Sequence, residues 1–473
     1  MTLHNLRRVQ SLLALCATLV LAPGLWGQEA SDSSVPTDWD AVTKAATELL
    51  LPAVEDGLTV GLVVGIVRGS ESRVLALGET RLGSGQGPDA DSIYEIGSVS
   101  KVFTGLLLAD AATRGIVELD DTVEDLLDGV VEVPTFADQP VQLWHLSTHT
   151  SGLPRMPSNM ARANPEDPYA DYTVKEMYDA LEGCDLERAP GERYAYSNLA
   201  VGLLGNLLVR EQDEAAGYAG LLRKRITTPL GLEHTAILLT PWMTEHLVPG
   251  YDVDQNPKQN WDLPAFAGAG GIRSNMSDML RFADACLHPE PGPLAQAMEL
   301  SMEIRHREAG GVVMGLGWHV GSNGSTRWHN GQTGGYHTYF ALWPEGDVAV
   351  VLLSNTTSGL LDLFADNVLL LMMGRKPREL QYKKALPLDL EASEEYVGEY
   401  KLGPLARLTV TLNEKRMMAQ MTFQSQIRIY PSGPDRFFYR AVEAELLFQR
   451  DESGAVVGVE ILQGGRTTKG KRE

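Results

Sequence analysis

The sequence predicts an α/β protein with a small all-β domain at its C-terminus. Strand-like patterns rich in valine and leucine occur near both ends of the first 375 residues. The region between 120 and 260 is rich in proline, glycine and acidic residues and has only short helical patterns. The last eighty residues alternate over short stretches separated by turn signals. These observations predict a sheet assembled from both ends of the chain, flanked by helices, interrupted by a helical insert and followed by a small barrel or sandwich.

The N-terminus has the pattern of an export signal. Arg7 and Arg8 precede an apolar stretch at 12–21, and Gly27 is a small residue suited to a cleavage site. The apolar stretch is too short for a membrane span. We therefore expect residues 1–27 to be a signal peptide and the mature chain to be periplasmic or secreted, without a stable membrane span.

The elements of the predicted sheet domain follow in order along the chain. Residues 38–51 have helical spacing, 58–67 and 73–77 are expected strands, and 102–113 is so apolar that burial on all sides is expected. The remaining expected elements are helices at 174–181, 199–212 and 360–373 and strands at 315–320, 336–342 and 347–355.

Charge and turn residues divide the chain after that domain. Residues 376–394 lack periodicity and are predicted to be a linker between a larger domain at 36–375 and a β domain at 395–473. Seven short strands are expected in the β domain. The basic tail at 466–472 is interpreted as a solvated end.

Composition excludes several classes of function. The chain has 473 residues, of which 44% are hydrophobic, and a formal net charge of -22. Such an acidic protein is a poor partner for nucleic acid or anionic membrane. No cysteine–histidine cluster with metal spacing and no glycine-rich phosphate loop occurs in the sequence, so no metal or cofactor is predicted. Cys184 and Cys286 of the mature chain can either pair or remain thiols. The oligomeric state is left open.

The segment 94–101, YEIGSVSK, carries the strongest chemical signal. Ser98 and Lys101 stand three residues apart at the start of an apolar helix, so the lysine amine can reach the serine oxygen. This pair is a nucleophile with a base beside it. Ser100 is interpreted as a buried hydroxyl.

Two later segments complete a constellation with this pair. Tyr196 and Asn198 place a phenol and a carboxamide two residues apart. His329, Asn330 and Gly331 then open a glycine-rich stretch before an apolar strand, where glycine lets backbones approach closely.

Together these three segments resemble the class C β-lactamase and penicillin-binding serine hydrolase family. The resemblance covers roughly residues 40–375 and includes two further segments, 146–154 and 270–274. It implies an antiparallel sheet of the β-lactamase/DD-peptidase type. The C-terminal residues resemble an accessory β domain found beside such hydrolases. The segment 94–101 departs from the usual signature only at Tyr94, where phenylalanine is common.

The resemblance implies a role for each motif residue. Ser98 becomes acylated, Lys101 must provide a neutral amine, and Tyr196 relays the proton to the leaving group. Asn198 is expected to bond the lysine and the substrate amide, because a carboxamide both donates and accepts. The backbone N–H groups of Ser98 and Gln332 are expected to form the oxyanion hole.

The third motif differs from that of β-lactamases, which carry Lys-Thr-Gly there. His329 offers less positive charge than lysine at neutral pH, and Asn330 donates differently from a hydroxyl. Together with Asn198, Gly331 and Gln332, these two residues are the predicted substrate-binding residues. In this family, histidine occurs at that position in D-alanyl carboxypeptidases, D-aminopeptidases and esterases.

The sequence therefore predicts an exported serine hydrolase that cleaves a β-lactam or a related amide or ester. The alternatives are a D-alanyl carboxypeptidase or D-aminopeptidase, an esterase, and a penicillin-binding module without turnover. No Gly-x-Ser-x-Gly elbow occurs, which argues against an α/β-hydrolase. His145 and His149 are four residues apart, but no third ligand has zincin spacing, so packing histidines are favoured over a metal site.

Overall fold

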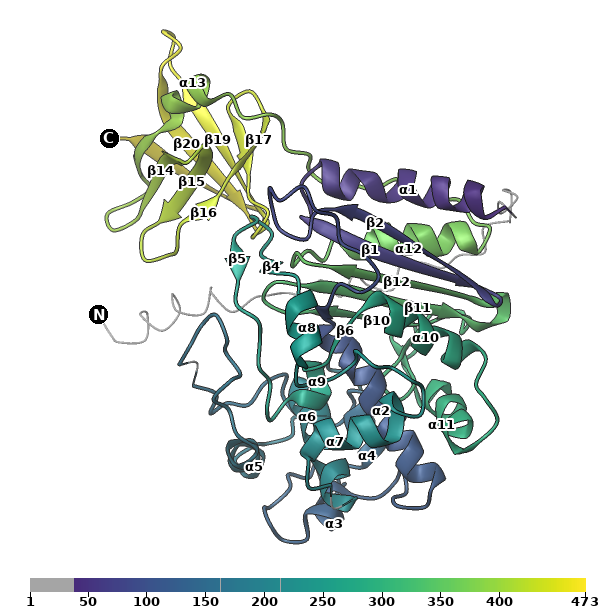
Figure 1. The fold of residues 1–473 in the computed structure, drawn as a ribbon. Helices are drawn as coiled ribbons and strands as arrows, with labels where there is room; N and C mark the ends of the chain where they lie inside the picture. The colour runs from purple at the N-terminus through teal and green to yellow at the C-terminus, as the bar shows by residue number, and fades with distance from the viewer. Residues whose placement is uncertain (1–37, 162, 213) are drawn as a thin grey trace.

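The computed structural model describes residues 38–161, 163–212 and 214–473. Figure 1 shows a larger body of sheet and helices and a smaller all-β body made by the end of the chain. The larger body contains the eight-stranded antiparallel sheet expected from the resemblance, and its strand order is β2-β1-β12-β11-β10-β9-β8-β7. The fold class is therefore confirmed.

The centre of this sheet joins the two ends of the domain. Strand β1 (Gly61–Arg68) pairs with β2 (Glu71–Gly78) on one side and with β12 (Val348–Ser354) on the other. The other strands are β11 (His337–Trp343), β10 (Arg327–Gln332), β9 (His319–Val320), β8 (Val313–Met314) and β7 (His306–Arg307). The glycine-rich third motif thus forms a strand of its own, β10, which the sequence did not predict.

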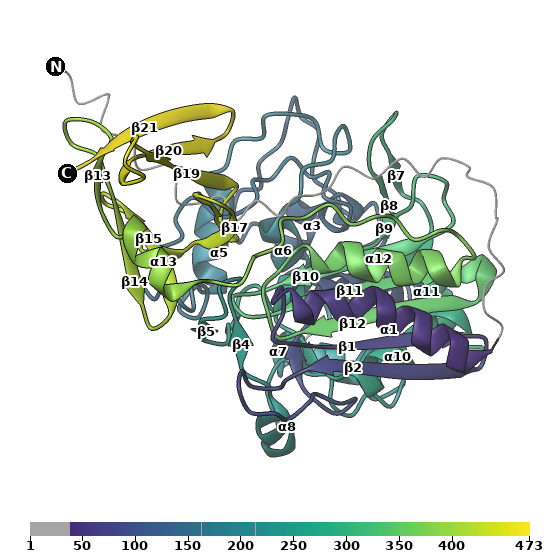
Figure 2. The same ribbon diagram turned by 90° about the horizontal axis from the view of Figure 1, so that it is seen from above.

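Helices cover both faces of the sheet. Figures 1 and 2 show α1 (Trp39–Glu55) and α12 (Leu361–Met372) side by side on one face. Alternate residues of β1 point to opposite sides: Val64 packs in the cluster with α1 and α12, whereas Val63 packs in the cluster that contains α2 (Ser100–Thr113). All residues from Ser100 to Ala111 are buried, so α2 is the all-round buried helix that the sequence predicted.

The helical insert lies on the α2 side of the sheet and holds short elements. Its helices are α3 (Val123–Leu127), α4 (Leu143–Ser147), α5 (Val174–Glu182), α6 (Asn198–Glu211), α7 (Gly217–Leu222), α8 (Pro241–His246) and α9 (Ala267–Gly270), followed by α10 (Met276–Leu287) and α11 (Pro293–Met302). Two small sheets pair β3 (Tyr94–Glu95) with β6 (Arg273–Ser274) and β4 (Gly250–Tyr251) with β5 (Pro257–Lys258).

The smaller body is a nine-stranded antiparallel sheet that curls into a near-closed barrel, with strand order β16-β15-β14-β13-β21-β20-β19-β18-β17. Its strands are β13 (Gly398–Lys401), β14 (Arg407–Asn413), β15 (Arg416–Met421), β16 (Ile427–Arg428), β17 (Tyr430–Gly433), β18 (Arg436–Phe438), β19 (Ala444–Arg450), β20 (Val456–Gln463) and β21 (Arg466–Arg472). A short helix, α13 (Leu390–Ser393), precedes them.

The interpretation of residues 466–472 as a solvated end was wrong. They form β21, which pairs with β20 and β13 through backbone hydrogen bonds. Their side chains are mostly exposed, and only Gly470 is fully buried. The alternation that reveals a half-buried strand is therefore missing from this sequence.

Side chains of the barrel hold it against the larger body. The Arg440 guanidinium donates to the backbone oxygens of Asp56 and Gly57, 2.5 Å away in each case. The Tyr430 hydroxyl donates to Asp254, 3.1 Å away, next to the hairpin of β4 and β5. Residues 375–389 between the two bodies have neither helix nor strand. The limits of the predicted domains stay a prediction.

The two cysteines that the sequence left open are free thiols, and Cys286 is buried. The predicted signal peptide lies outside the described residues. Within the described part of the chain, no helix is long and apolar enough to cross a bilayer.

Candidate active site

The candidate nucleophile lies where a tight turn enters α2. Ser98 is half-buried in the 3-10 turn Gly97–Val99. Gly97 has φ +50, a conformation that favours glycine, and a Cβ there would lie 2.6 Å from the backbone nitrogen of Gln332. The turn that carries Ser98 therefore packs directly against the backbone of β10.

Both predicted proton-transfer partners are hydrogen-bonded to Ser98. The Lys101 amine lies 3.0 Å from the Ser98 Oγ, and the Tyr196 hydroxyl lies 2.7 Å from the same oxygen. Lys101 also donates to the backbone oxygen of Ala269, 2.5 Å away. The serine oxygen thus stands between an amine and a phenol, which is the geometry needed to remove its proton.

Electrostatics favour the uncharged form of both partners. Burial, together with the positive charge of Arg155, holds the pKa of Lys101 well below its ordinary value. The N-terminal end of α2 adds to this effect, because a helix N-terminus disfavours positive charge. Burial raises the pKa of Tyr196 to about 12, against the lowering effects of its hydrogen bond with Ser98 and of Arg155.

The second motif begins helix α6. Ser197 is the N-cap and accepts from the backbone N–H of Ala200, which is why the helix starts at this point. Asn198, the first residue of the helix, donates to the Met156 sulfur at 3.5 Å. No hydrogen bond between Asn198 and Lys101 is formed in this conformation, and the expected bond of Asn198 to the substrate amide stays a prediction.

The third motif divides its residues between the two faces of the sheet. His329 is buried near Tyr196, with ring centroids 6.4 Å apart. Asn330 faces the opposite side, where its amide donates to Asp362 of α12, 2.6 Å away. The side chain of Asn330 is therefore not brought to the Ser98 cluster. This follows from the period of two in a strand.

Gly331 and Gln332 contribute through backbone. A Cβ on Gly331 would lie 2.0 Å from the Ile96 oxygen and 3.0 Å from the Ser98 nitrogen, so only glycine fits there. The close approach also explains why Gln332 lies beside the Ser98 turn.

Sequence reasoning missed several contacts of the motif residues, some at the Ser98 cluster and others on the opposite face of the sheet. The oxygen of Ala269 holds Lys101, and Asp362 binds both Asn330 and His337, the latter at 2.7 Å. His149 packs against Tyr196 with ring centroids 4.3 Å apart and the rings tilted by 32°, and its Nδ1 accepts from the Ser197 backbone N–H. The motif at 146–154 signalled His149, but not that its ring would support the phenol.

The other hydroxyl and the other histidine of these motifs contact backbone. Ser100 accepts from the N–H of Ile272, 3.1 Å away. His145 accepts at Nδ1 from the N–H of Gln142 at the start of α4. In residues 38–161, 163–212 and 214–473, no three histidine, cysteine or acidic side chains gather as metal ligands.

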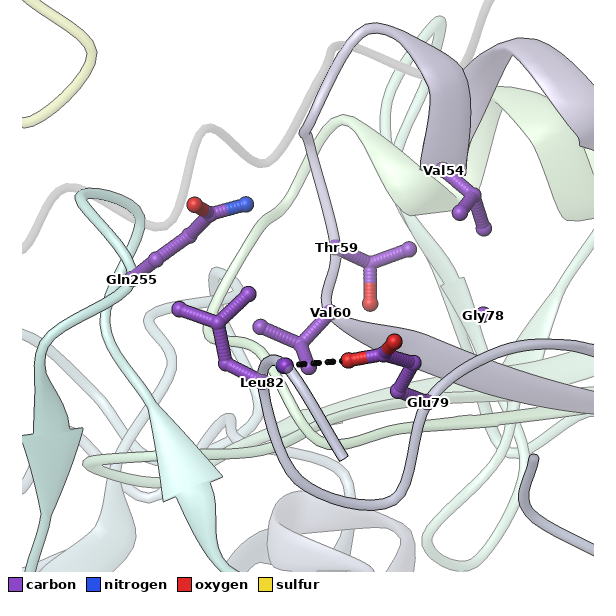
Figure 3. Close-up of a pocket in the computed structure, with 8 residues that line it drawn as sticks. Val54, Thr59, Val60, Gly78, Glu79, Leu82 and Gln255 are labelled. Carbon is purple, nitrogen blue, oxygen red and sulfur yellow. Dashed lines mark hydrogen bonds between the residues drawn. The ribbon is translucent and has the colours of Figure 1, made fainter. Parts of the chain in front are cut away.

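A hollow of about 490 Å³ lies apart from these residues, at the edge of the sheet (Figure 3). It is lined by Val54, Thr59, Val60, Gly78, Glu79, Leu82, Gly83 and Gln255. The Glu79 carboxylate accepts from the backbone N–H groups of Gly83 and Gly85, so it stabilises the loop that follows it. The hollow contains none of the catalytic candidates.

A serine held between a buried lysine and a tyrosine, on this α/β fold, defines a serine hydrolase that works by acyl transfer. The chain belongs to the beta-lactamase family, whose family model matches residues 46–371. The enzyme class and the family expected from the sequence are confirmed.

Its named relatives include both peptidases and β-lactamases. The D-alanyl-D-alanine-carboxypeptidase/endopeptidase AmpH of Escherichia coli is 26% identical over 343 residues, covering 67% of this chain and 86% of that protein. Penicillin-binding protein 4* of Bacillus subtilis is 26% identical over 391 residues, covering 77% and 84%. A beta-lactamase of Yersinia enterocolitica is 25% identical over 354 residues, covering 66% and 87%.

A solved structure has the same architecture. The beta-lactamase/D-alanine carboxypeptidase of Yersinia pestis, in complex with citrate, superposes with a TM-score of 0.61 and 25% identity. The match covers 71% of this chain and all of that one.

Proposed function

We propose that this protein hydrolyses D-alanyl peptides through a Ser98 acyl-enzyme and that β-lactams acylate the same serine. The environment of the third motif is the observation that favours D-alanyl peptides over β-lactams as the substrate that is turned over. His329 is buried, and burial together with His319 and Lys101 holds its pKa well below the ordinary value, so it is neutral at pH 7. Asn330 is turned away to Asp362. The motif therefore supplies neither the charge nor the side-chain donor that β-lactamases place there.

In the proposed reaction, Ser98 attacks the carbonyl carbon of the substrate. Its proton passes to the neutral Lys101–Tyr196 pair, and the Tyr196 hydroxyl gives a proton to the leaving nitrogen. The backbone N–H groups of Ser98 and Gln332 bind the oxyanion, each contributing about 3 kcal/mol. Water then removes the acyl group by the same proton route in reverse.

Turnover of β-lactams is the second candidate function, supported by relatives named as β-lactamases. The two functions share acylation and differ in how fast water releases the acyl group. We further propose that the protein acts outside the cytoplasm, since residues 1–27 have the pattern of a signal peptide.

The test compares two substrates with one enzyme preparation. Release of D-alanine from a peptide ending in D-alanyl-D-alanine is measured beside hydrolysis of a chromogenic cephalosporin, each with wild type and Ser98→Ala. Peptide turnover with slow cephalosporin turnover, both dependent on Ser98, is expected. Fast cephalosporin turnover without peptide cleavage would reverse the assignment. Covalent labelling by a fluorescent penicillin without any turnover would identify a binding module.

A further inference from the structure

The third motif places a neutral side chain near the Tyr196 phenol, with ring centroids 6.4 Å apart. In the family pattern a lysine stands at the position of His329, whereas here that imidazole is neutral at pH 7. Burial also holds the pKa of Lys101 well below its ordinary value, which disfavours the positive charge on its amine. A phenol that must release and take up protons is harder to ionise when no positive charge faces it.

A different residue brings positive charge to the same ring. The guanidinium carbon of Arg155 lies 5.0 Å from the centroid of the Tyr196 ring, and the Lys101 amine lies 4.9 Å from the same centroid. An arginine stays protonated at every pH at which proteins fold, so its charge does not depend on burial of the site.

Hydrogen bonds join the backbone around Arg155 to the second motif. Its carbonyl oxygen accepts from the N–H groups of Asn198 and Leu199, at 3.0 and 3.3 Å. The preceding Pro154 oxygen accepts from the Ser197 hydroxyl at 2.7 Å. The loop that carries the arginine is thus hydrogen-bonded to the residues that follow Tyr196, and these bonds fix the backbone of Arg155 beside the second motif.

We propose that Arg155 supplies, beside the Tyr196 phenol, the positive charge that the third motif of this chain lacks. It acts through Tyr196 and Lys101 and is therefore a positioning residue, not a catalytic one. The proposal rests on the proposed acyl-enzyme function of the same site. A fixed positive charge favours the state of the Lys101–Tyr196 pair that has lost a proton, whichever of the two groups gives it up.

The other groups around Tyr196 do not replace this charge. They are His149, Tyr169 and Tyr194 in the insert, His319 on β9, His329 on β10, Lys101 on α2, and Glu308, which accepts from the Tyr194 N–H. Burial lowers the pKa of His319 to about 4 and holds that of His149 well below its ordinary value, so both are neutral at pH 7. Glu308 is acidic and opposes Arg155 electrostatically.

The test measures how fast Ser98 reacts as the pH changes. An uncharged fluorescent fluorophosphonate is used as the probe, because it reports the reactivity of the serine whatever the natural substrate is. Labelling rates from pH 4 to 9 are compared for wild type, Arg155→Gln, Arg155→Lys and Arg193→Gln. Arg193 is exposed, lies three residues before Tyr196 and is the matched control.

For Arg155→Gln, the acidic limb of the profile is expected to move up by about half to one pH unit, because Arg155 is exposed and solvent screens its charge. The rate below the limb falls by roughly 3- to 10-fold, and the rate at high pH recovers. Arg155→Lys should restore most of the profile, and Arg193→Gln should match wild type.

Two results would overturn the role of Arg155. One is a profile of Arg155→Gln that superposes on wild type. The other is an equal loss at every pH that Arg155→Lys does not rescue, which would mean that Arg155 only holds the loop. Labelling of Ser98→Ala as fast as wild type would instead remove the proposed acyl-enzyme, while failure to cleave peptides or β-lactams leaves this test intact.

Discussion

Replacing Gly331 with alanine tests whether the contact between β10 and the Ser98 turn sets the activity. A Cβ at this position would lie 2.0 Å from the Ile96 oxygen, and carbon and oxygen atoms ordinarily stay about 3.3 Å apart. Both neighbours are backbone, so no side chain can swing aside. The strand and the turn must therefore separate by roughly 1 Å.

A displacement of that size moves Ser98 relative to Gln332, the two residues whose N–H groups are proposed to bind the oxyanion. A misplacement of about 1 Å can lower the rate by about 100-fold. The overpacked backbone should also reduce the free energy of unfolding by about 1–3 kcal/mol. The assay is the rate of acylation by a fluorescent penicillin, read beside a urea unfolding curve.

Gly359→Ala is the matched control, because a Cβ on Gly359 meets nothing within 4 Å. It should behave as wild type in both measurements. If Gly331→Ala acylates within twofold of wild type and unfolds at the same urea concentration, then the close contact does not position the site and the reasoning fails.

Three further outcomes follow from the geometry. Tyr196→Phe removes the hydroxyl that bonds Ser98 but keeps the ring, so acylation should fall by about 100- to 10,000-fold with an unchanged melting temperature; normal acylation would assign the relay elsewhere. The folded pKa of Lys101 lies below its unfolded value, so the folded state binds fewer protons than the unfolded state over the range between them. Wild type should therefore gain stability relative to Lys101→Met as the pH rises from about 7 to 9, measured by urea unfolding, and a flat difference would contradict a neutral lysine. Arg440→Ala removes both hydrogen bonds to the end of α1 and should speed proteolysis within residues 375–389, while unchanged cleavage would show that other contacts hold the barrel.

Residues that are close in sequence were placed correctly in space. Ser98 and Lys101 are joined by one turn of backbone, so their spacing alone brings them together. Tyr196 is 98 residues away from Ser98 in the sequence, and its place beside the serine was expected from the family resemblance. The expected strands at 58–67, 336–342 and 347–355 and the expected helix at 102–113 were found to within a few residues, because β1, β11, β12 and α2 are strongly apolar. Local periodicity carries that information. The strand β10 was missed, and the expected strand at 315–320 forms only at 319–320.

Contacts made through backbone or between distant segments could not be predicted in the same way. The Ala269 oxygen that holds Lys101 has no side-chain signal at all. Nothing in the spacing of Arg155 and Tyr196 indicates that their loops are hydrogen-bonded together. The direction of the Asn330 side chain, by contrast, could have been predicted. Once β10 is known to be a strand, alternation places His329 and Asn330 on opposite faces.

The pairing of β1 with β12 has a consequence for how the chain is made. The hydroxyls of Thr59 and Ser354 lie 2.8 Å apart although 295 residues separate them in sequence. During synthesis β1 waits without this partner until most of the polypeptide has emerged from the ribosome, and closing so long a loop slows folding. The nascent chain therefore stays unfolded until β12 has been made. Until then it can be cleaved by proteases and bound by chaperones.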